Sequence, residues 1–346
     1  MRKVLFALLV LLVLLAGGAA AAAWRYDESR HDRLAEGVVI AGIDVGGMRV
    51  ADARAELVRR VSTRLEEPIA VLYRNGRFVF APTKADVATN LDALLAAALA
   101  KTRDGNFLTR AFRDVTGGRL STDLPLDVNY SSAAVRRFVR SVVRQVDRKA
   151  TNAKSTASFA GVQISPSENG VAVKSERLTA RISGALVDPD AVRSFPLPTR
   201  VVRPKVTTAE LEQRYHYFLA VSRSRKELRF FVDRRLAKTY EVAIGRIGYE
   251  TPAGLYEIRT KAVNPAWFVP NKPWAGDLAG KVIPPNDPEN PIKARWMGFW
   301  DGAGIHGTAE ADSIGSAASH GCIRMRVRDV IELYDRVPLH TPLYIS

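Results

Sequence analysis

The sequence predicts an α+β N-terminal region followed by a mainly β C-terminal domain. Two observations support this fold class. Strand-like, helix-like and hairpin-like segments alternate between residues 37 and 195. From residue 213 onward, short strand-like runs bounded by turn residues predominate. Residues 197–208 contain two prolines and form the best candidate for a linker between the two parts.

The chain begins with an apolar run that is long enough to cross a membrane. Residues Val4–Trp24 carry no charge and follow Arg2 and Lys3. About 20 helical residues span a hydrocarbon core of ~30 Å, and positive charges before the run predict that the body lies outside the cytoplasm. We therefore expect residues 1–24 to be a signal anchor. A cleaved signal peptide is the alternative, because Ala19–Ala23 offers small-residue cleavage sites.

Residues 37–205 form the predicted α+β region, in which one series of elements occurs twice. The first series is a strand and turn (37–48), a helix (50–65), a hairpin around Asn75-Gly76 (68–82) and a helix (91–100). The second is a strand (126–128), a helix (131–149), a hairpin around Asn169-Gly170 (159–173) and a helix (178–186). The spacing differs between the two series, so a loose duplication (about 37–120 and 121–195) and a recurrent α+β architecture both remain open.

Residues 213–346 form the predicted mainly β domain, with a short helix at 208–215 in front of it. Its expected strands are 217–222, 228–232, 238–244, 254–260 and 343–345, and one amphipathic helix covers 327–337. The segment 264–300 holds four of the five tryptophans, Trp267, Trp274, Trp296 and Trp300. A long loop inside a compact domain is usually functional, and tryptophan rings offer a flat apolar surface to a peptide or sugar.

The chain is strongly basic, with a formal net charge of +15 and a pI of about 10.1. Nucleic acid is the usual partner of such a chain, but we expect no nucleic-acid binding from an exported protein. Anionic envelope polymers and lipid head groups are the expected counterparts. A general role of the charge in solubility is the alternative.

The chain contains one cysteine, Cys322, in the sequence Ser-His-Gly-Cys-Ile-Arg-Met. Exported proteins usually carry cysteines in pairs, as disulfides, so this thiol is either an inert buried residue or one kept for its chemistry. His306 and His320 lie within 16 residues upstream. An imidazole can take the thiol proton and later return it to a leaving amine. Gly321 allows a turn in which backbone N–H groups converge as an oxyanion hole.

Zinc binding by His306, His320 and Cys322 is a competing interpretation. Structural zinc sites favour paired cysteines or histidines at defined spacings. A His-x-Cys spacing with no second cysteine does not match them. The sequence therefore predicts no metal site, and the absence of phosphate-binding glycine loops predicts no cofactor.

The Ile-His-Gly-Thr motif followed by Ser-His-Gly-Cys-Ile-Arg-Met resembles the active-site signature of the L,D-transpeptidases, bacterial enzymes that cross-link peptidoglycan. Upstream, Gly245–Ile258 resembles the family's Thr-Pro-x-Gly strand segment, and Asn264–Trp300 resembles the loop that overhangs the cleft in some members. The resemblance covers about residues 213–346. It implies a β-sandwich-like catalytic domain with a long cleft loop and a few short helices.

The resemblance also implies roles for individual residues. Cys322 would be the nucleophile and His306 the general base, with its ring held by a backbone carbonyl near Gly307. The backbone N–H groups around His320, Gly321 and Cys322 would form the oxyanion hole, and the His320 ring would lie against the thiol. The residues expected to shape the site or bind substrate are Ser319, Arg324, Gly307, Thr308, Tyr249, Trp267 and Trp300.

The resemblance implies an enzyme of the cell envelope that forms a thioester between Cys322 and a peptidoglycan stem tetrapeptide and passes the acyl group to an amine of a second stem. It also implies that carbapenems acylate the thiol. Two alternatives use the same acylation: hydrolysis by an L,D-carboxypeptidase, and attachment of a protein to the wall. The remaining alternative is a non-catalytic peptidoglycan-binding scaffold.

The region 37–205 resembles the peptidoglycan-binding domains found ahead of such catalytic domains. No residue in it points to chemistry. A spacer that holds the catalytic domain away from the membrane is the alternative role.

Overall fold

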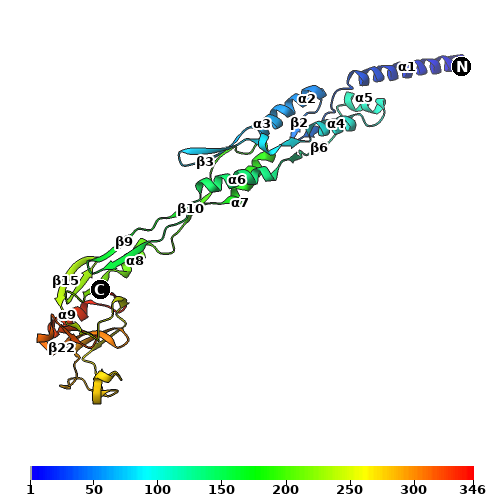
Figure 1. Ribbon diagram of the computed structural model, residues 1–346. Coiled ribbons are helices and arrows are strands. Elements are labelled where there is room, and N and C mark those ends of the chain that lie inside the picture. The colour runs from blue at the N-terminus through cyan, green and yellow to red at the C-terminus, as the bar shows by residue number, and fades with distance from the viewer. Residues whose placement is uncertain (1) are drawn as a thin grey trace. The chain divides into compact units, whose positions relative to one another are not determined.

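The computed structural model describes residues 2–346, which divide into two compact units (Figure 1). The first unit contains the chain up to Arg148 together with Val171–Val201. The second contains Lys149–Gly170 together with Val202–Ser346. The first unit is α+β and the second is mainly β, so the fold class predicted from the sequence is confirmed.

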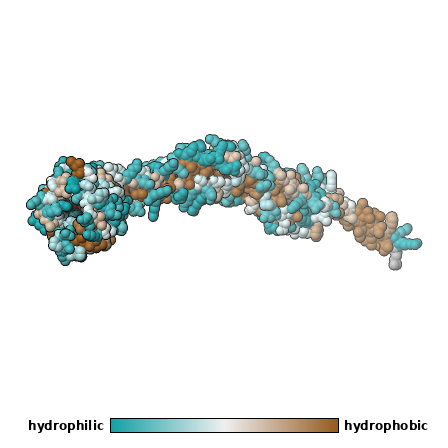
Figure 2. Space-filling view, turned by 60° about the horizontal axis from the view of Figure 1, so that its bottom comes forward, coloured by the Kyte–Doolittle hydropathy of each residue, from teal (hydrophilic) through white to brown (hydrophobic). Residues whose placement is uncertain are grey.

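Helix α1 (Arg2–Ser29) contains the predicted apolar run. It is the one helix among the described residues that is long and apolar enough to cross a membrane, although a signal sequence near an N-terminus meets the same criteria. Figure 2 shows its apolar run as a hydrophobic segment with hydrophilic residues at the tip. The apolar side chains Leu5–Leu15 are exposed to solvent in the protein alone.

Short helices and small sheets build the rest of the first unit. The helices are α2 (Val50–Leu57), α3 (Thr63–Glu66), α4 (Leu91–Thr102), α5 (Phe107–Val115), α6 (Ser132–Val146) and α7 (Ser175–Val187), with a π-helical turn over Val58–Ser62 and a 3-10 turn over Pro82–Ala85. The strands are β1 (Val38–Ile40), β2 (Ile43–Asp44), β3 (Ile69–Tyr73), β4 (Gly76–Phe80), β5 (Ala88–Thr89), β6 (Thr122–Leu124), β7 (Val128–Asn129), β10 (Gly170–Val173), β11 (Ser194–Pro196) and β12 (Thr199–Val202). They pair in the orders β2-β1-β6, β11-β3-β4, β10-β12 and β5-β7.

Two hydrophobic cores stabilise this unit. One lies under α2 and α4 and includes Ile40, Leu57 and Leu95. The other lies between the β3-β4 hairpin and the helices α6 and α7, and includes Val139 and Ile182. The hairpin of the first predicted series therefore packs with the helices of the second series, so the two cores do not follow the two predicted series. The helix α5 was not expected from the sequence.

The first predicted hairpin is confirmed, because β3 and β4 pair across the Arg74-Asn75 turn. The second predicted hairpin, around Asn169-Gly170, is wrong. Strands β8 (Lys154–Ser158) and β9 (Gly161–Ser165) instead turn at Phe159-Ala160, and the pairing extends outward to Thr151 with Glu168. Gly170 instead begins β10, which pairs with β12, so Asn169-Gly170 does not form the turn of a hairpin.

The second unit contains two main sheets. Strands β13 (Tyr217–Ser222), β14 (Glu227–Val232), β15 (Arg235–Glu241), β17 (Gly254–Glu257) and β25 (Pro342–Ile345) form one sheet in the order β15-β14-β13-β25-β17. Strands β18 (Thr260–Val263), β21 (Lys293–Trp300), β22 (Ala303–Thr308) and β24 (Ile323–Arg326) form the other in the order β18-β21-β22-β24. The predicted strand 254–260 therefore divides between the two sheets.

Smaller elements complete the second unit. They are the helices α8 (Thr208–Arg214) and α9 (Val327–Arg336), the paired strands β16 (Ile244–Gly245) with β23 (Ala317–Ser319) and β19 (Trp267–Phe268) with β20 (Val282–Ile283), and 3-10 turns over Pro273–Leu278 and Ala311–Ser313. Helix α8 begins with a capping box, in which Thr207 Oγ1 accepts from the Glu210 N–H and a Glu210 carboxylate oxygen accepts from the Thr207 N–H.

One core joins the two main sheets and α9. It contains Leu219 and Phe230 from the first sheet, Phe299 and Ile305 from the second, and Leu333 from α9, all fully buried. This arrangement of two sheets over one core agrees with the predicted β-sandwich-like domain.

The β8-β9 hairpin packs on the outside of the first sheet. Its residues Ala153 and Val162 share a smaller core with Phe218 and Phe231. Gly161 lies close to the ring of Phe231, since a Cβ at this position would approach Phe231 Cε1 to 3.3 Å. The structure therefore places this hairpin, which the sequence analysis assigned to the region 37–205, with the second unit.

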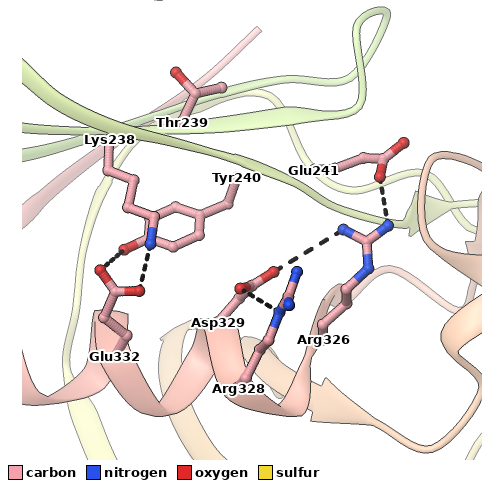
Figure 3. Close-up of a pocket in the computed structure, with 8 residues that line it drawn as sticks. All are labelled: Lys238, Thr239, Tyr240, Glu241, Arg326, Arg328, Asp329 and Glu332. Atoms are coloured by element: carbon pink, nitrogen blue, oxygen red, sulfur yellow. Dashed lines mark hydrogen bonds and ion pairs between the residues drawn. The ribbon is translucent and has the colours of Figure 1, made fainter.

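Helix α9 is attached to β15 through a charged pocket of about 430 Å³ (Figure 3). Glu332 binds both Lys238 and the hydroxyl of Tyr240, and the pKa of Tyr240 rises to about 12 because of burial and the nearby Glu332 carboxylate. Arg326 binds Glu241 at 2.6 Å. The acids and bases in this pocket neutralise one another, so it joins α9 to the sheet and offers no free reactive group.

We expect Phe231→Ala to destabilise the second unit by about 3–5 kcal/mol, as for other buried phenylalanines, because Phe231 is 3% exposed and is covered by the hairpin. Leu236→Ala in the same sheet is the matched control and should change the unfolding free energy far less, because Leu236 is 52% exposed. Urea denaturation followed by near-ultraviolet circular dichroism measures both. Equal changes in the unfolding free energy of the two variants would show that packing of the β8-β9 hairpin on Phe231 does not stabilise the second unit.

Candidate active site

The pairing of β22 with β24 brings the sequence motifs together. The two strands are parallel, with His306 beside Arg324 and Ile305 beside Ile323. Side chains alternate between the two faces of a sheet, and Ile305 and Ile323 are fully buried in the core. His306, Arg324 and Cys322, the residue just before β24, therefore point away from the core.

These residues line a cavity of about 1020 Å³. Its walls come from β18, β21, β22, the turn before β24 and the long segment after β18. The lining residues are Thr260, Ala262, Pro265, Ala266, Trp267, Phe268, Pro270, Lys272, Trp274, Ala275, Leu278, Glu289, Pro291, Ile292, Trp296, Asp301, Gly302, Ala303, His306, Ser319, His320, Cys322 and Arg324.

His306 is held in one tautomer. Its Nδ1 lies 2.9 Å from the carbonyl oxygen of Gly307, and because a carbonyl only accepts, Nδ1 carries the proton and Nε2 has a free lone pair. This is the carbonyl contact expected from the sequence. Burial lowers the pKa of His306 to about 4, and the positive charge of Arg324 acts in the same direction. The ring is therefore neutral at physiological pH and can accept a proton.

Cys322 is a neutral thiol in the resting protein. Burial of the sulfur raises its pKa, and a hydrogen bond from the backbone of Gly304 and the charge of Arg324 partly offset this effect. The thiol also lies 3.9 Å from the carbonyl oxygen of Gly302. A thiolate is the reactive form, so this site needs a base that removes the proton as the thiol reacts.

Ser319 holds the turn that carries the cysteine. Its buried hydroxyl donates to the carbonyl oxygen of Cys322 at 2.6 Å and accepts from the N–H of Gly321 at 3.2 Å. Gly321 adopts a φ of +108°, which a residue with a side chain rarely adopts. Because the Gly321 N–H is already used by Ser319, the expected oxyanion role of this N–H does not fit the geometry. Gly321 instead allows the turn.

The ring of His320 is also committed. Arg246 donates a hydrogen bond to His320 Nε2 at 2.7 Å, which leaves the proton on Nδ1. Burial first, and then the charges of Arg246 and Arg324, lower the pKa of His320. The indole of Trp274 stacks on the ring at a centroid distance of 4.3 Å, and the ring of Tyr249 meets its edge at 4.9 Å. His320 is thus a neutral ring that joins the loop to the catalytic turn.

Residues 216–345 match the family model of the L,D-transpeptidase catalytic domain (YkuD). The Bacillus subtilis protein named "Putative L,D-transpeptidase YqjB" is 33% identical over 135 residues, which cover 37% of this chain and 70% of the relative.

This chain belongs to the L,D-transpeptidase family.

The chain is also similar to other proteins. A Bacillus licheniformis protein named for L,D-transpeptidase YkuD is 36% identical over 38% of this chain and 66% of its own length. A solved structure of an L,D-transpeptidase from Mycobacterium smegmatis covers 60% of this chain and 85% of its own length at 16% identity, with a TM-score of 0.31. Residues 78–192 match the family model "Putative peptidoglycan binding domain".

Several residues predicted for the site of this family member lie elsewhere. Trp300 is 47% exposed, packs beside Tyr256 at a centroid distance of 6.1 Å and does not line the cavity. Thr308 is buried, and its hydroxyl accepts from the N–H of Glu310. Tyr249 reaches the site only through the ring of His320.

Arg324 does line the cavity and forms an ion pair with Glu310 at 2.7 Å. Among residues 2–346, no group of three or more His, Cys, Asp and Glu side chains forms a candidate metal site.

Sequence analysis named Trp267 for the cavity and missed Trp274 and Trp296 as site residues. Trp267 lines the cavity and stacks beside Trp274 at 6.5 Å. Trp296 lies opposite His306 in the β21-β22 pairing, and their rings stack at 6.0 Å. A Cβ on Gly304 would lie 2.5 Å from Trp296, so glycine leaves room for the indole across the strands. The close spacing of tryptophans in 264–300 was the available signal, but it did not tell which ring faces the thiol.

We expect Ser319→Ala to slow acylation of Cys322 at least tenfold, because it leaves the Gly321 N–H and the Cys322 carbonyl without their buried partner, a loss of about 1–3 kcal/mol. Ser316→Ala is the matched control, since Ser316 Oγ donates to the carbonyl of Ser313 and does not touch the turn. The rate of thiol acylation by an activated acyl donor measures the effect. Equal rates for the two variants would remove Ser319 from the positioning of the nucleophile.

The low pKa of His306 predicts an acid-tolerant enzyme. The base is lost only when the ring is protonated, so the acylation rate should hold between pH 7 and pH 5 and fall as the pH approaches about 4. Single-turnover acylation followed by intact mass, with circular dichroism at each pH to confirm folding, gives this profile. An inflection near pH 6.5, the usual pKa of a histidine, would contradict the buried neutral state.

Proposed function

We propose that this chain is a peptidoglycan L,D-transpeptidase that cross-links stem peptides through a thioester on Cys322. The supporting observation is that Cys322 and a neutral His306, whose Nδ1–H is bound to the Gly307 carbonyl, line one cavity. The hydrogen bond at Nδ1 leaves Nε2 as the proton acceptor. A thiol and a neutral imidazole that share one cavity supply the two groups that a nucleophile with its own general base needs.

In the proposed first half-reaction, His306 Nε2 takes the thiol proton as Sγ attacks the carbonyl carbon of the third stem residue, a diamino acid, at its L-centre. The tetrahedral intermediate collapses when its bond to the nitrogen of terminal D-alanine breaks. His306 returns the proton to that nitrogen, so D-alanine leaves as a neutral amine and Cys322 holds the tripeptide as a thioester. The N–H of Gly304, which already bonds the sulfur, stabilises the developing thiolate.

In the second half-reaction, the side-chain amine of another stem attacks the thioester. His306 takes the amine proton and returns it to the departing sulfur, so the thiol is regenerated and an amide cross-link forms. The backbone N–H groups of His320 and Cys322 are the donors that we assign to the oxyanion of both intermediates, since the Gly321 N–H is occupied by Ser319.

The cavity favours an amine acceptor over water. Its volume of about 1020 Å³ lies at the upper end of the ~300–1,000 Å³ range of ligand pockets, which leaves room for a second peptide beside the donor. The apolar rings of Trp267, Trp274 and Trp296 reduce the access of water to the thioester. Hydrolysis and attachment of a protein to the wall remain outcomes of the experiment below.

We also propose that the first unit binds peptidoglycan and that α1 anchors the enzyme to the cytoplasmic membrane, with the catalytic unit in the cell envelope. The match of residues 78–192 to a peptidoglycan-binding model supports the first part. The length and hydropathy of α1 support the second. A spacer role for the first unit and a cleaved α1 are the competing outcomes.

An anionic envelope polymer is the proposed partner of α6. The arginines Arg136, Arg137, Arg140 and Arg144 are all exposed on the side of this helix away from its buried valines. Some arginines of other helical segments are paired with acids, as in Arg59 with Glu56 and Arg336 with Glu332. Like charges four residues apart destabilise a helix, so an external polyanion would relieve a repulsion that the fold leaves in place.

The intact mass of the protein after incubation with a stem tetrapeptide or a carbapenem tests the thioester. We expect a covalent adduct on the wild type and none on Cys322→Ala. With tetrapeptide alone, hydrolysis would release tripeptide; with an added amine acceptor, transpeptidation should produce the cross-linked dimer. No adduct on folded wild-type protein would reject the enzyme and favour the binding scaffold.

A further inference from the structure

Helix α5 presents an unusual apolar edge to solvent. Leu108 is 49% exposed, and Phe112 and Val115 are each 72% exposed. These residues are four and three positions apart, so they lie along one line of the helix. Large apolar side chains in a continuous row are commonly covered by a partner or a membrane.

The other sides of α5 are fixed against the protein. Ala111 is buried, and Arg113 donates to the carbonyl oxygen of Thr102 at 3.1 Å. Asn106 caps the helix, because its side-chain oxygen accepts from the N–H of Thr109. The orientation of α5 is thus set by its contacts, and the apolar edge is the side left uncovered.

Helix α5 is bound by ion pairs to the C-terminal end of α1. Arg110 donates two hydrogen bonds to the carboxylate of Asp27, at 2.8 and 2.6 Å, and Arg103 lies 3.7 Å from the same carboxylate. Asp27 is the one buried residue of α1. Arg30 adds an ion pair with Asp114 at 3.5 Å. Figure 1 shows α5 beside the C-terminal part of α1.

The covered side of α1 extends toward its apolar run. Ala20 and Ala23 are half-buried and lie on the same side as Asp27, while most of the apolar residues before them are exposed. The uncharged segment Val4–Trp24 matches the ~20 residues that a bilayer core requires. Its end, at Trp24, is therefore at the level of the membrane–water interface on the side away from the cytoplasm, and tryptophan is enriched at such interfaces.

We propose that α5 lies in this interface and inserts Leu108, Phe112 and Val115 into the boundary between the head groups and the acyl chains of the membrane that α1 crosses. The occupant is lipid because α5 packs beside α1, an apolar helix of membrane-spanning length. Amphipathic helices bind membranes with the apolar face buried about 5–10 Å into this boundary.

This inference rests on the proposed anchoring by α1 and adds a second membrane contact. A unit attached by a single membrane-spanning helix can rotate about the axis of that helix. A second contact fixed to it by Arg110 and Asp27 restricts the orientation of the base of the first unit on the membrane. The ion pair is suited to this position, since Arg110 and Asp27 neutralise each other in a region of low polarity.

Depth measurement by spin labels tests the proposal in the full chain reconstituted into vesicles of phosphatidylglycerol and phosphatidylethanolamine. Single labels are placed by Phe112→Cys, Val192→Cys or Leu12→Cys in a Cys322→Ala chain, so that one thiol reacts. Val192 is the matched control, because it is also 72% exposed but lies after α7. Electron paramagnetic resonance compares collisions with oxygen, which concentrates in the bilayer, and with a water-soluble nickel complex.

The label at 112 should collide more with oxygen and less with nickel than the label at 192. A label at 112 that is as accessible to nickel as the label at 192 would overturn the proposal. The label at 12 separates this failure from failure of the anchor. If the label at 12 lies deep in the bilayer and the label at 112 lies in water, only the membrane contact of α5 is rejected. If both labels lie in water, the membrane span of α1 is rejected, and the interface contact of α5 with it.

Discussion

The parallel pairing of β22 with β24 is the constraint on which the active site depends. The two motifs are separated in the sequence, and only this register places Ile305 beside Ile323 in the core and His306 beside Arg324 on the cavity face. The apolar members of each strand drive the pairing, because they are fully buried between the sheets. The reactive side chains occupy the alternate positions and are oriented by the same packing. A slip of one residue would turn His306 into the core.

Burial decides the chemistry of the residues that the register brings together. It lowers the pKa of His306 and raises that of Cys322, so the resting site holds a neutral imidazole and a neutral thiol, not an ion pair. The proton is then available for transfer during the attack on the substrate. One hydrogen bond sets the tautomer of each histidine. The Gly307 carbonyl accepts from Nδ1 of His306, and Arg246 donates to Nε2 of His320. Of these two histidines, only His306 keeps a free nitrogen lone pair, which makes it the better candidate for the base.

Sequence reasoning succeeded where the signal was local and failed where distant segments compete. The helices with a clear apolar period and the hairpin at Asn75-Gly76 were predicted because each is stabilised by neighbouring residues. The hairpin at Asn169-Gly170 was not formed, since pairing of Glu168 with Thr151 and of β10 with β12 satisfies the backbone better than a local turn. The prediction of Trp300 as a site residue instead of Trp296 failed for a similar reason. Both tryptophans belong to β21, and an irregularity in the pairing between Gly298 and Trp300 decides which ring faces the cavity.

The sequence by itself indicated the family, because Ile-His-Gly-Thr and Ser-His-Gly-Cys-Ile-Arg-Met resemble the family's signature, and it indicated the fold class through the change to short strand-like runs after residue 213. It also singled out Cys322 and His306 as the candidate nucleophile and base. Tertiary structure alone decided how these groups are used. The Gly321 N–H could be assigned to Ser319, His320 to Arg246 and Trp274, and α5 to α1 only once the chain was folded. Hydrogen bonds and ring contacts between distant segments depend on distances of a few ångströms, and no spacing along the chain encodes those distances.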